Sequence, residues 1–166
     1  MHDVLIPPEQ RRDPAWHDGS GTGRDRCRTP MQWDGSATGG FTTGDPWLPL
    51  APDVGLRNVQ AQRNDPHSML ALHRRLIQLR RVQPALSVGD YEPISVGAHT
   101  LAYLRRAGGR AFAIALNLGS EPAAVALPAE GRIALSTALD RQHEPVGAVV
   151  ALRADEGVIV ELAPGA

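Results

Sequence analysis

Hydrophobic and polar positions divide the 166-residue chain into three stretches with different patterns. Residues 1–64 show neither the two-residue alternation of a strand nor the 3.6-residue period of a helix, and they are dense in Gly, Pro, Asp and Arg. Two interpretations are open, a disordered leader and a long irregular loop. The second is favoured because disordered segments are poor in aromatic residues, and this one holds all three tryptophans. We expect its aromatics to rest on a surface that the chain does not contain; they are Trp16, Trp33, Phe41 and Trp47.

Residues 65–81 carry the clearest helical pattern of the sequence. Asp65 is a suitable N-cap, and Pro66 suits the first helical position, where its missing N–H costs nothing. Pro84 ends any continuation. Arginines cover one side, and two of them, Arg80 and Arg81, favour the helix dipole at the C-terminal end. Apolar residues recur at steps of three and four and predict a face that is buried; they are Met69, Leu70, Leu72, Leu76, Ile77 and Leu79.

Residues 85–166 change to short β-rich runs separated by turn residues, which is typical of a small antiparallel sandwich. Two of the runs flank 105–109 and predict a hairpin, and residues 153–157 predict another tight reversal. The predicted strands are 100–104, 111–116, 123–127, 132–139, 148–152 and 158–162. The expected fold is therefore mainly β: a C-terminal antiparallel β-sandwich preceded by one long helix and a long irregular loop.

Composition narrows the classes of partner. The formal net charge is −1, from 17 basic and 18 acidic side chains, so neither nucleic acid nor an acidic membrane surface is an expected partner. The sequence has no apolar run of about 18 residues and no secretory signal at its start. Its single cysteine, Cys27, allows no intramolecular disulfide and fits a reducing compartment. These features together predict a cytoplasmic location.

Two motifs in the first stretch are long and unusual in composition. One covers residues 23–34 and contains Arg-Thr-Pro-Met-Gln-Trp at 28–33; the other covers 40–49 and begins Gly-Phe-Thr-Thr-Gly. They resemble the loop after the eighth barrel strand in α-glucosidases and oligo-1,6-glucosidases of the α-amylase family, glycoside hydrolase family thirteen. Residues 58–80 resemble the last barrel helix of the same enzymes. The resemblance implies three parts: that loop at 1–64, the last barrel helix and a linker at 65–84, and a C-terminal all-β domain at 85–166.

A complete eight-stranded α/β barrel needs about 200 residues or more, which the part before the β-rich region does not supply. The chain also lacks the Arg-x-Asp, acid/base Glu and Asn-His-Asp segments that carry catalytic carboxylates in the resembling family. We therefore expect no catalytic residue here. The chain would be the C-terminal fragment of a retaining α-glucosidase, inactive by itself. The loop acids are interpreted as solvated loop or turn residues; they are Asp13, Asp18, Asp25, Asp34 and Asp45.

Arg28 is the one candidate substrate-binding residue. In the resembling enzymes the arginine of this motif hydrogen-bonds the non-reducing-end glucose, a task suited to the fixed donors of a guanidinium. The alternative is an arginine paired with an Asp of the loop. Trp33, Phe41 and Trp47 are expected to pack against a barrel rather than to stack on sugar. Cys27 is interpreted as an ordinary loop residue and His73 as a packing residue, and no metal or cofactor is expected.

Two other functions remain open. One is the C-terminal part of a trehalose synthase, which isomerises maltose and carries a similar loop. The other is a non-catalytic β-sandwich that binds glycans or a protein, although residues 85–166 offer only Tyr91, Tyr103 and Phe112 as aromatics. The expected partner in an intact enzyme is an α-gluco-oligosaccharide. The apolar helix face is expected to dock on the chain's own β region, to self-associate or to aggregate.

Overall fold

The computed structural model describes residues 4–17 and 23–165, and it contains two compact units, Met1–Leu70 and Ala71–Ala166. Each unit has its own buried apolar cluster and is described by itself. In the described part of the chain no helix is both long and apolar enough to cross a membrane.

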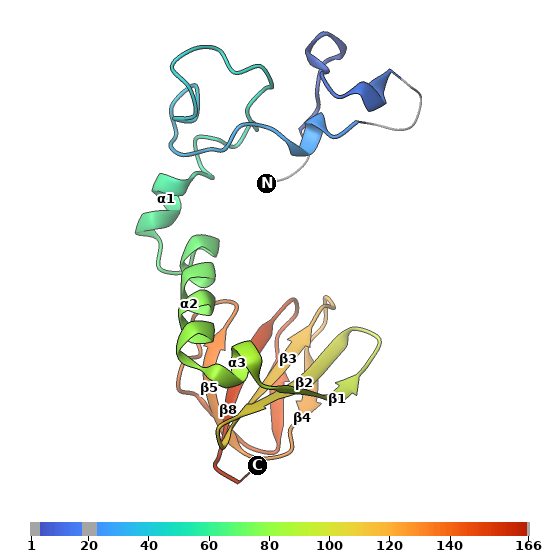
Figure 1. Ribbon diagram of the computed structural model, residues 1–166, viewed down its shortest axis with the longest axis vertical. Coiled ribbons are helices and arrows are strands. Elements are labelled where there is room, and N and C mark those ends of the chain that lie inside the picture. Colours follow the sequence, from blue (N-terminus) through green and yellow to red (C-terminus); the bar gives the residue numbers. More distant parts are fainter. Residues whose placement is uncertain (1–3, 18–22, 166) are drawn as a thin grey trace. The chain divides into compact units, whose positions relative to one another are not determined.

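The first unit is mostly irregular, as the sequence pattern predicts. Three single-turn 3-10 helices cover Pro8–Gln10, Pro14–Trp16 and Asp25–Cys27, and one short α-helix, α1, covers Val59–Asn64 (Figure 1). A small apolar cluster holds the loop together where its start meets residues near 50; its members are Val4, Ile6, Leu48 and Ala51. The long loop therefore has a small core of its own.

The expected helix start at Asp65 is wrong. Asn58 caps α1, its side chain accepting from the Ala61 N–H, and Asp65 lies at the C-terminal end of that helix. The Asp65 carboxylate accepts from the His67 N–H in a tight turn, and helix α2 (Met69–Val82) begins only afterwards. Gln62 supplies an acceptor for the new helix through its bond with the Leu70 N–H. The Gln62 side chain thus accepts a hydrogen bond from the first turn of α2, the capping role that the sequence pattern assigned to Asp65.

The second unit contains most of α2, whose apolar stripe packs on the β strands of the same unit. Leu72 is buried with Leu135 and Leu139, and Ala71, Leu76, Leu79 and Ile159 pack around them. Of the three outcomes expected for the helix face, docking on the chain's own β region is therefore the one observed. Pro84 ends α2 as predicted, but it also begins a further short helix, α3 (Pro84–Val88).

The strands of the second unit form two antiparallel sheets. The larger has the order β1-β2-β3-β8-β5-β6 and the smaller pairs β4 with β7. Neither β1 nor β6 is expected from the sequence pattern. The strands are β1 (Asp90–Val96), β2 (Thr100–Ala107), β3 (Arg110–Asn117), β4 (Ala123–Ala126), β5 (Gly131–Ser136), β6 (Pro145–Val146), β7 (Val149–Leu152) and β8 (Gly157–Leu162).

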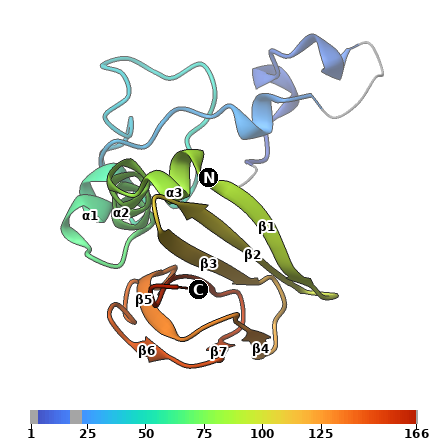
Figure 2. The same ribbon diagram turned by 60° about the horizontal axis from the view of Figure 1, so that its bottom comes forward.

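Alternation along β3 explains how the large sheet is covered on both faces. Phe112 and Ile114 pack under α3 with Ala85, whereas Ala113 and Ala115 join a cluster that includes Val125 of β4 and residues of β7. Successive side chains of a strand point to opposite faces, so one strand serves two cores. Figure 2 shows α3 on one side of β2 and β3 and the β4–β7 pair on the other.

Turn chemistry sets two connections of this unit. The β2–β3 hairpin turns at Gly108 and Gly109, whose φ angles of 59° and 75° suit a two-residue turn, so the strands run further than the expected loop 105–109 allowed. Residues 153–156 do reverse the chain, but β7 pairs with β4 and β8 pairs with β3 and β5. That reversal therefore joins the two sheets instead of closing a hairpin. The broad expectation of a mainly β chain with antiparallel sheets and few helices is confirmed.

Candidate functional site

Arg28 lies directly after the 3-10 helix Asp25–Cys27, and its backbone N–H bonds the Asp25 carbonyl at 3.0 Å. Its side chain is 56% exposed, and Nη1 lies 3.8 Å from Oδ2 of Asp13. That distance is too long for a hydrogen bond, so the pair is a loose electrostatic contact. The structure thus places Arg28 beside an acid of its own loop while leaving about half of its side chain accessible.

The Asp25 carboxylate organises the turn that precedes Arg28. Its Oδ2 accepts hydrogen bonds from the backbone N–H of Arg12 at 2.6 Å, from that of Asp13 at 2.9 Å and from Nε1 of Trp16 at 2.9 Å. Burial favours a higher pKa, but these hydrogen bonds outweigh it and hold the pKa of Asp25 below its ordinary value. Asp25 is therefore an ionised clamp on residues 12–16.

Asp13, presented by that clamp, binds Arg24 closely. Oδ2 accepts from Arg24 Nε at 2.7 Å and from the Arg24 backbone N–H at 3.1 Å, while Oδ1 accepts from the Ala15 N–H at 3.0 Å. The hydrogen bond from Arg24 is the main reason that the pKa of Asp13 lies well below its ordinary range. The side chain of Asp13 is 1% exposed.

Two of the five loop acids therefore differ from the expectation of solvated residues. Asp13 and Asp25 are buried and form an internal network with donors more than ten positions away in the sequence. Asp34 fits the expected turn role, since its Oδ1 accepts from the Ser36 N–H, and Asp45 is exposed. Asp18 lies outside the described residues.

The pair Asp13 and Asp25 does not have the properties of a glycosidase dyad. A catalytic acid needs a raised pKa so that it holds a proton at neutral pH. Both carboxylates here have lowered pKa values, and their oxygens accept hydrogen bonds from donors within the loop. Their chemistry is therefore that of structural anions that position arginines and a backbone turn.

Trp16 corrects the expectation that the loop aromatics rest on a missing surface. The Arg11 guanidinium lies 4.2 Å from the centroid of its ring, and its Nε1 bonds Asp25. Gly23, at φ +63°, comes so close that a Cβ there would lie 2.3 Å from Nε1 of Trp16. Trp16 thus packs within its own loop. The other three are different: Trp33 is 48% exposed, Phe41 49% and Trp47 66%.

Gln32 ties the Arg-Thr-Pro-Met-Gln-Trp motif to the start of α1. Its Nε2 donates to the Arg57 carbonyl at 2.9 Å, and its own carbonyl accepts from the Val59 N–H at 2.9 Å. Gln32 is 8% exposed, whereas Met31 is 42% exposed. Gln32 therefore holds the loop in shape. The motif alone does not distinguish such a structural residue from one that contacts substrate.

Cys27 is exposed, and its Sγ lies 3.1 Å from the Arg24 carbonyl. Across residues 4–17 and 23–165 no group of three or more His, Cys, Asp or Glu side chains could hold a metal ion. Cys27 thus makes only a local contact, in keeping with its interpretation as a loop residue.

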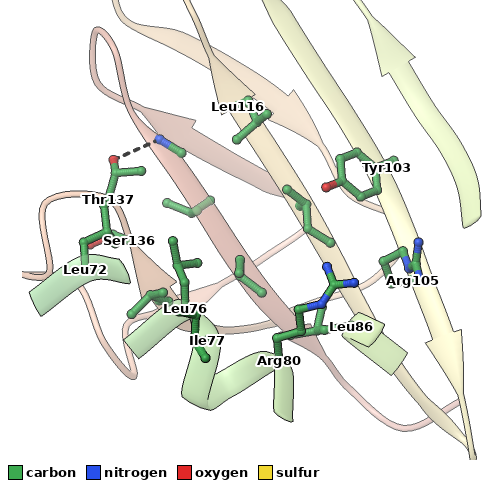
Figure 3. Close-up of a pocket in the computed structure, with 15 residues that line it drawn as sticks. Leu72, Leu76, Ile77, Arg80, Leu86, Tyr103, Arg105, Leu116, Ser136 and Thr137 are labelled. Atoms are coloured by element: carbon green, nitrogen blue, oxygen red, sulfur yellow. Dashed lines mark hydrogen bonds between the residues drawn. The ribbon is translucent and has the colours of Figure 1, made fainter. Parts of the chain in front are cut away.

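The β unit holds an apolar groove of about 400 Å³ between α2, α3 and the large sheet (Figure 3). Leu72, Leu76 and Ile77 come from α2, and Tyr103 and Leu116 come from the sheet. Thr137 Oγ1 at its end accepts from the Gly157 N–H. Its two charged lining residues are both arginines, Arg80 and Arg105, and Arg105 donates to carbonyls of α3. The lining has hydroxyls, from Tyr103, Ser136 and Thr137, but no carboxylate or histidine that could activate them, so the groove is a packing surface and not a reaction site.

Comparison with known proteins identifies the class of this chain. Residues 8–89 match the family model described as alpha amylase, catalytic domain. The chain belongs to the α-amylase family, glycoside hydrolase family thirteen, as the Arg28 motif predicts. The matched range includes the network around Asp13, both helices α1 and α2, and α3.

Two curated relatives are named as 1,6-glucosidases. Over 99 residues the chain is 39% identical to a glucan 1,6-alpha-glucosidase of Streptococcus pneumoniae, covering 60% of this chain and 18% of that protein. Over 107 residues it is 36% identical to an oligo-1,6-glucosidase of Parageobacillus thermoglucosidasius, covering 64% of this chain and 19% of that protein. The chain thus spans about a fifth of the length of these curated relatives.

Among solved structures, the fold resembles the trehalulose synthase MutB from Pseudomonas mesoacidophila MX-45. The TM-score is 0.85 at 27% identity, and the match covers 98% of this chain and 34% of MutB. Nearly the whole of this chain therefore has a structural counterpart inside a much longer protein.

Proposed function

We propose that this chain is the C-terminal part of a retaining α-glucosidase that acts on α-linked gluco-oligosaccharides. The observation that carries the proposal is the family match of residues 8–89 together with α-glucosidase and oligo-1,6-glucosidase relatives at 36–39% identity. In this proposal, residues 1–64 form the loop after the last barrel strand and α2 is the last barrel helix. The two sheets of the second unit form the C-terminal β-sandwich.

Arg28 is the proposed sugar-binding residue. Two observations support this role: its place in the Arg-Thr-Pro-Met-Gln-Trp motif, and a side chain that is 56% exposed beside a carboxylate already bound by Arg24. The guanidinium can then donate to neighbouring hydroxyls of a terminal glucose. Trp33, Phe41 and Trp47 are proposed to pack against the barrel; their exposure in this chain fits that role.

The chain alone is proposed to be inactive because the catalytic carboxylates would lie on barrel strands outside it. The direct test is incubation of the purified chain with p-nitrophenyl α-glucoside. No release of p-nitrophenol is expected, and release that survives further purification would contradict the proposal. A second test is the DNA upstream of the Met1 codon, where in-frame barrel strands with the missing carboxylates are expected.

An isomerase is the second candidate, because the solved relatives include the trehalulose synthase MutB. The family's trehalose synthases, which isomerise maltose, fall in the same class. The experiment is product analysis on the complete enzyme that contains this chain, with maltose, isomaltose and sucrose as substrates. Free glucose formed first as the α-anomer supports the hydrolase, whereas trehalose or trehalulose as the main product supports the isomerase.

A free-standing glycan-binding β-sandwich is a third possibility. Its supporting surface would be the Tyr91–Tyr103 pair, whose ring centroids lie 5.2 Å apart. Titration calorimetry of the chain with soluble glucans tests it, and a null result would remove this candidate.

A further inference from the structure

Two arginines of the loop approach one carboxylate, and they do so unequally. Arg24 binds Asp13 through Nε at 2.7 Å and Nη2 at 3.4 Å, whereas Arg28 remains at 3.8 Å. Both side chains are largely exposed, at 63% and 56%, so burial does not explain the difference. The difference comes from the positions of the donors around Asp13.

The Asp13 carboxylate has no room for another close donor. A carboxylate offers about four acceptor sites. Four donors already occupy them: the backbone N–H groups of Ala15 and Arg24, and Nε and Nη2 of Arg24. Asp13 also cannot shift toward Arg28, because its own N–H is bound by the buried Asp25. The guanidinium of Arg28 is therefore attracted to Asp13 by charge but is not hydrogen-bonded to it.

We propose that Arg24 is the positioning residue for Arg28. Arg24 occupies the acceptor sites of Asp13, so Arg28 cannot form a bidentate ion pair with the same carboxylate. The N–H donors of Arg28 therefore stay available to a hydroxyl-bearing ligand. Asp13 supplies the field that orients Arg28, and Arg24 removes the acceptor sites that would sequester it. The identity of the ligand as a sugar rests on the proposed function, whereas the competition between the two arginines stands independently of it.

The test measures arginine accessibility in the 166-residue chain itself. Phenylglyoxal modifies exposed guanidinium groups, and mass spectrometry of peptides gives the labelling rate of each arginine. Arg74, exposed on α2, serves as the internal reference. In Arg24→Met, Arg28 is expected to take the vacated sites on Asp13. Its labelling should then slow by about two- to fivefold, the range that an exposed ion pair supports.

Two further variants separate positioning from a loss of loop structure. Arg24→Lys still places a cation on Asp13, so labelling of Arg28 should remain near that of the unchanged chain. Asp13→Asn removes the anion, so labelling of Arg28 should rise. Unfolding of the loop in Arg24→Met would also raise it, which is opposite to the expected slowing.

Unchanged or faster labelling of Arg28 in Arg24→Met overturns the proposal, as does equal slowing in Arg24→Lys. Failure of the proposed sugar contact would show elsewhere. In the complete enzyme, Arg28→Lys would then leave the affinity for maltose unchanged, even though the labelling pattern followed the competition between the arginines.

Discussion

Arg153 Nη2 lies 2.6 Å from Oε1 of Glu156 across the reversal between β7 and β8, and the Glu156 side chain is only 3% exposed. Oε2 of Glu156 accepts from Arg141 Nη1 at 3.0 Å and from the Arg153 backbone N–H at 2.8 Å. One buried carboxylate thus joins the connection between the two sheets to the segment after β5. The pKa of Glu156 is lowered: burial alone would raise it, but the bonds from Arg153 and the charge of Arg141 prevail.

Glu156→Gln should destabilise the β unit, because it removes the negative charge that two guanidinium groups share. Hydrogen bonds to a charged group contribute about 1.5–3 kcal/mol, so a loss of at most about that size in the free energy of unfolding is expected. Urea unfolding followed by far-ultraviolet circular dichroism measures it. Glu121→Gln, at an exposed turn position, is the matched control and should change stability by less than about 0.5 kcal/mol. Equal effects of the two variants would show that Glu156 is not a structural anion.

Asp140 predicts an acid-dependent contribution to stability. Hydrogen bonds from Arg153 lower the pKa of its carboxyl from 3.8 to about 2. A carboxyl with a lowered pKa in the folded state stabilises the fold above its unfolded pKa, and this contribution disappears as the pH falls toward 2. Asp140→Asn should therefore be less stable than the unchanged chain at pH 6, with the difference shrinking between about pH 4 and pH 2. Denaturant unfolding at pH 6, 4 and 3 tests this, and a constant difference would contradict it.

Gly23→Ala should disrupt the clamp around Trp16. The new Cβ would lie 2.3 Å from Nε1 of Trp16, and the φ angle of +63° adds strain of about 1–2 kcal/mol for a residue with a side chain. The Trp16 indole N–H should lose its bond with Asp25 and shift in a ¹H–¹⁵N correlation spectrum. Gly44→Ala is the control, because a Cβ at that position would meet no atom within 4 Å and its φ is not in the left-handed region. An unshifted Trp16 signal in Gly23→Ala would exclude the clamp.

Local pattern was sufficient for elements marked by a short apolar run between turn residues or by a helical period. The run at 111–116 predicted β3, and the stripe through Leu72 and Leu76 predicted the buried face of α2. Strand β1 has no such signal: six of its seven residues are exposed, and backbone pairing with β2 holds it at the sheet edge. An edge strand of this kind is specified by its neighbour and not by its own sequence.

The loop around Arg28 also could be predicted only in part from the sequence. The motif that contains Arg28 was visible in the sequence, and the family match agrees with it. The burial of Asp13 and Asp25 was not visible, because their donors Arg12, Trp16 and Arg24 are separated along a stretch that has no periodic pattern. The helix start was missed for a related reason, since Gln62 bonds the Leu70 N–H across eight positions.

Leu72 and Met69 provide a comparison on one helix that tests how α2 is stabilised. Leu72 is 7% exposed against Leu135 and Leu139, whereas Met69 is 60% exposed. Leu72→Ala should lower the free energy of unfolding of the β unit by about 2–5 kcal/mol, since it removes buried methyl groups and leaves a cavity beside the groove. Met69→Ala should cost less than about 0.5 kcal/mol. Urea unfolding of both variants measures the difference. Similar losses would mean that Met69 is as well covered in solution as Leu72, as it would be in a self-associated state.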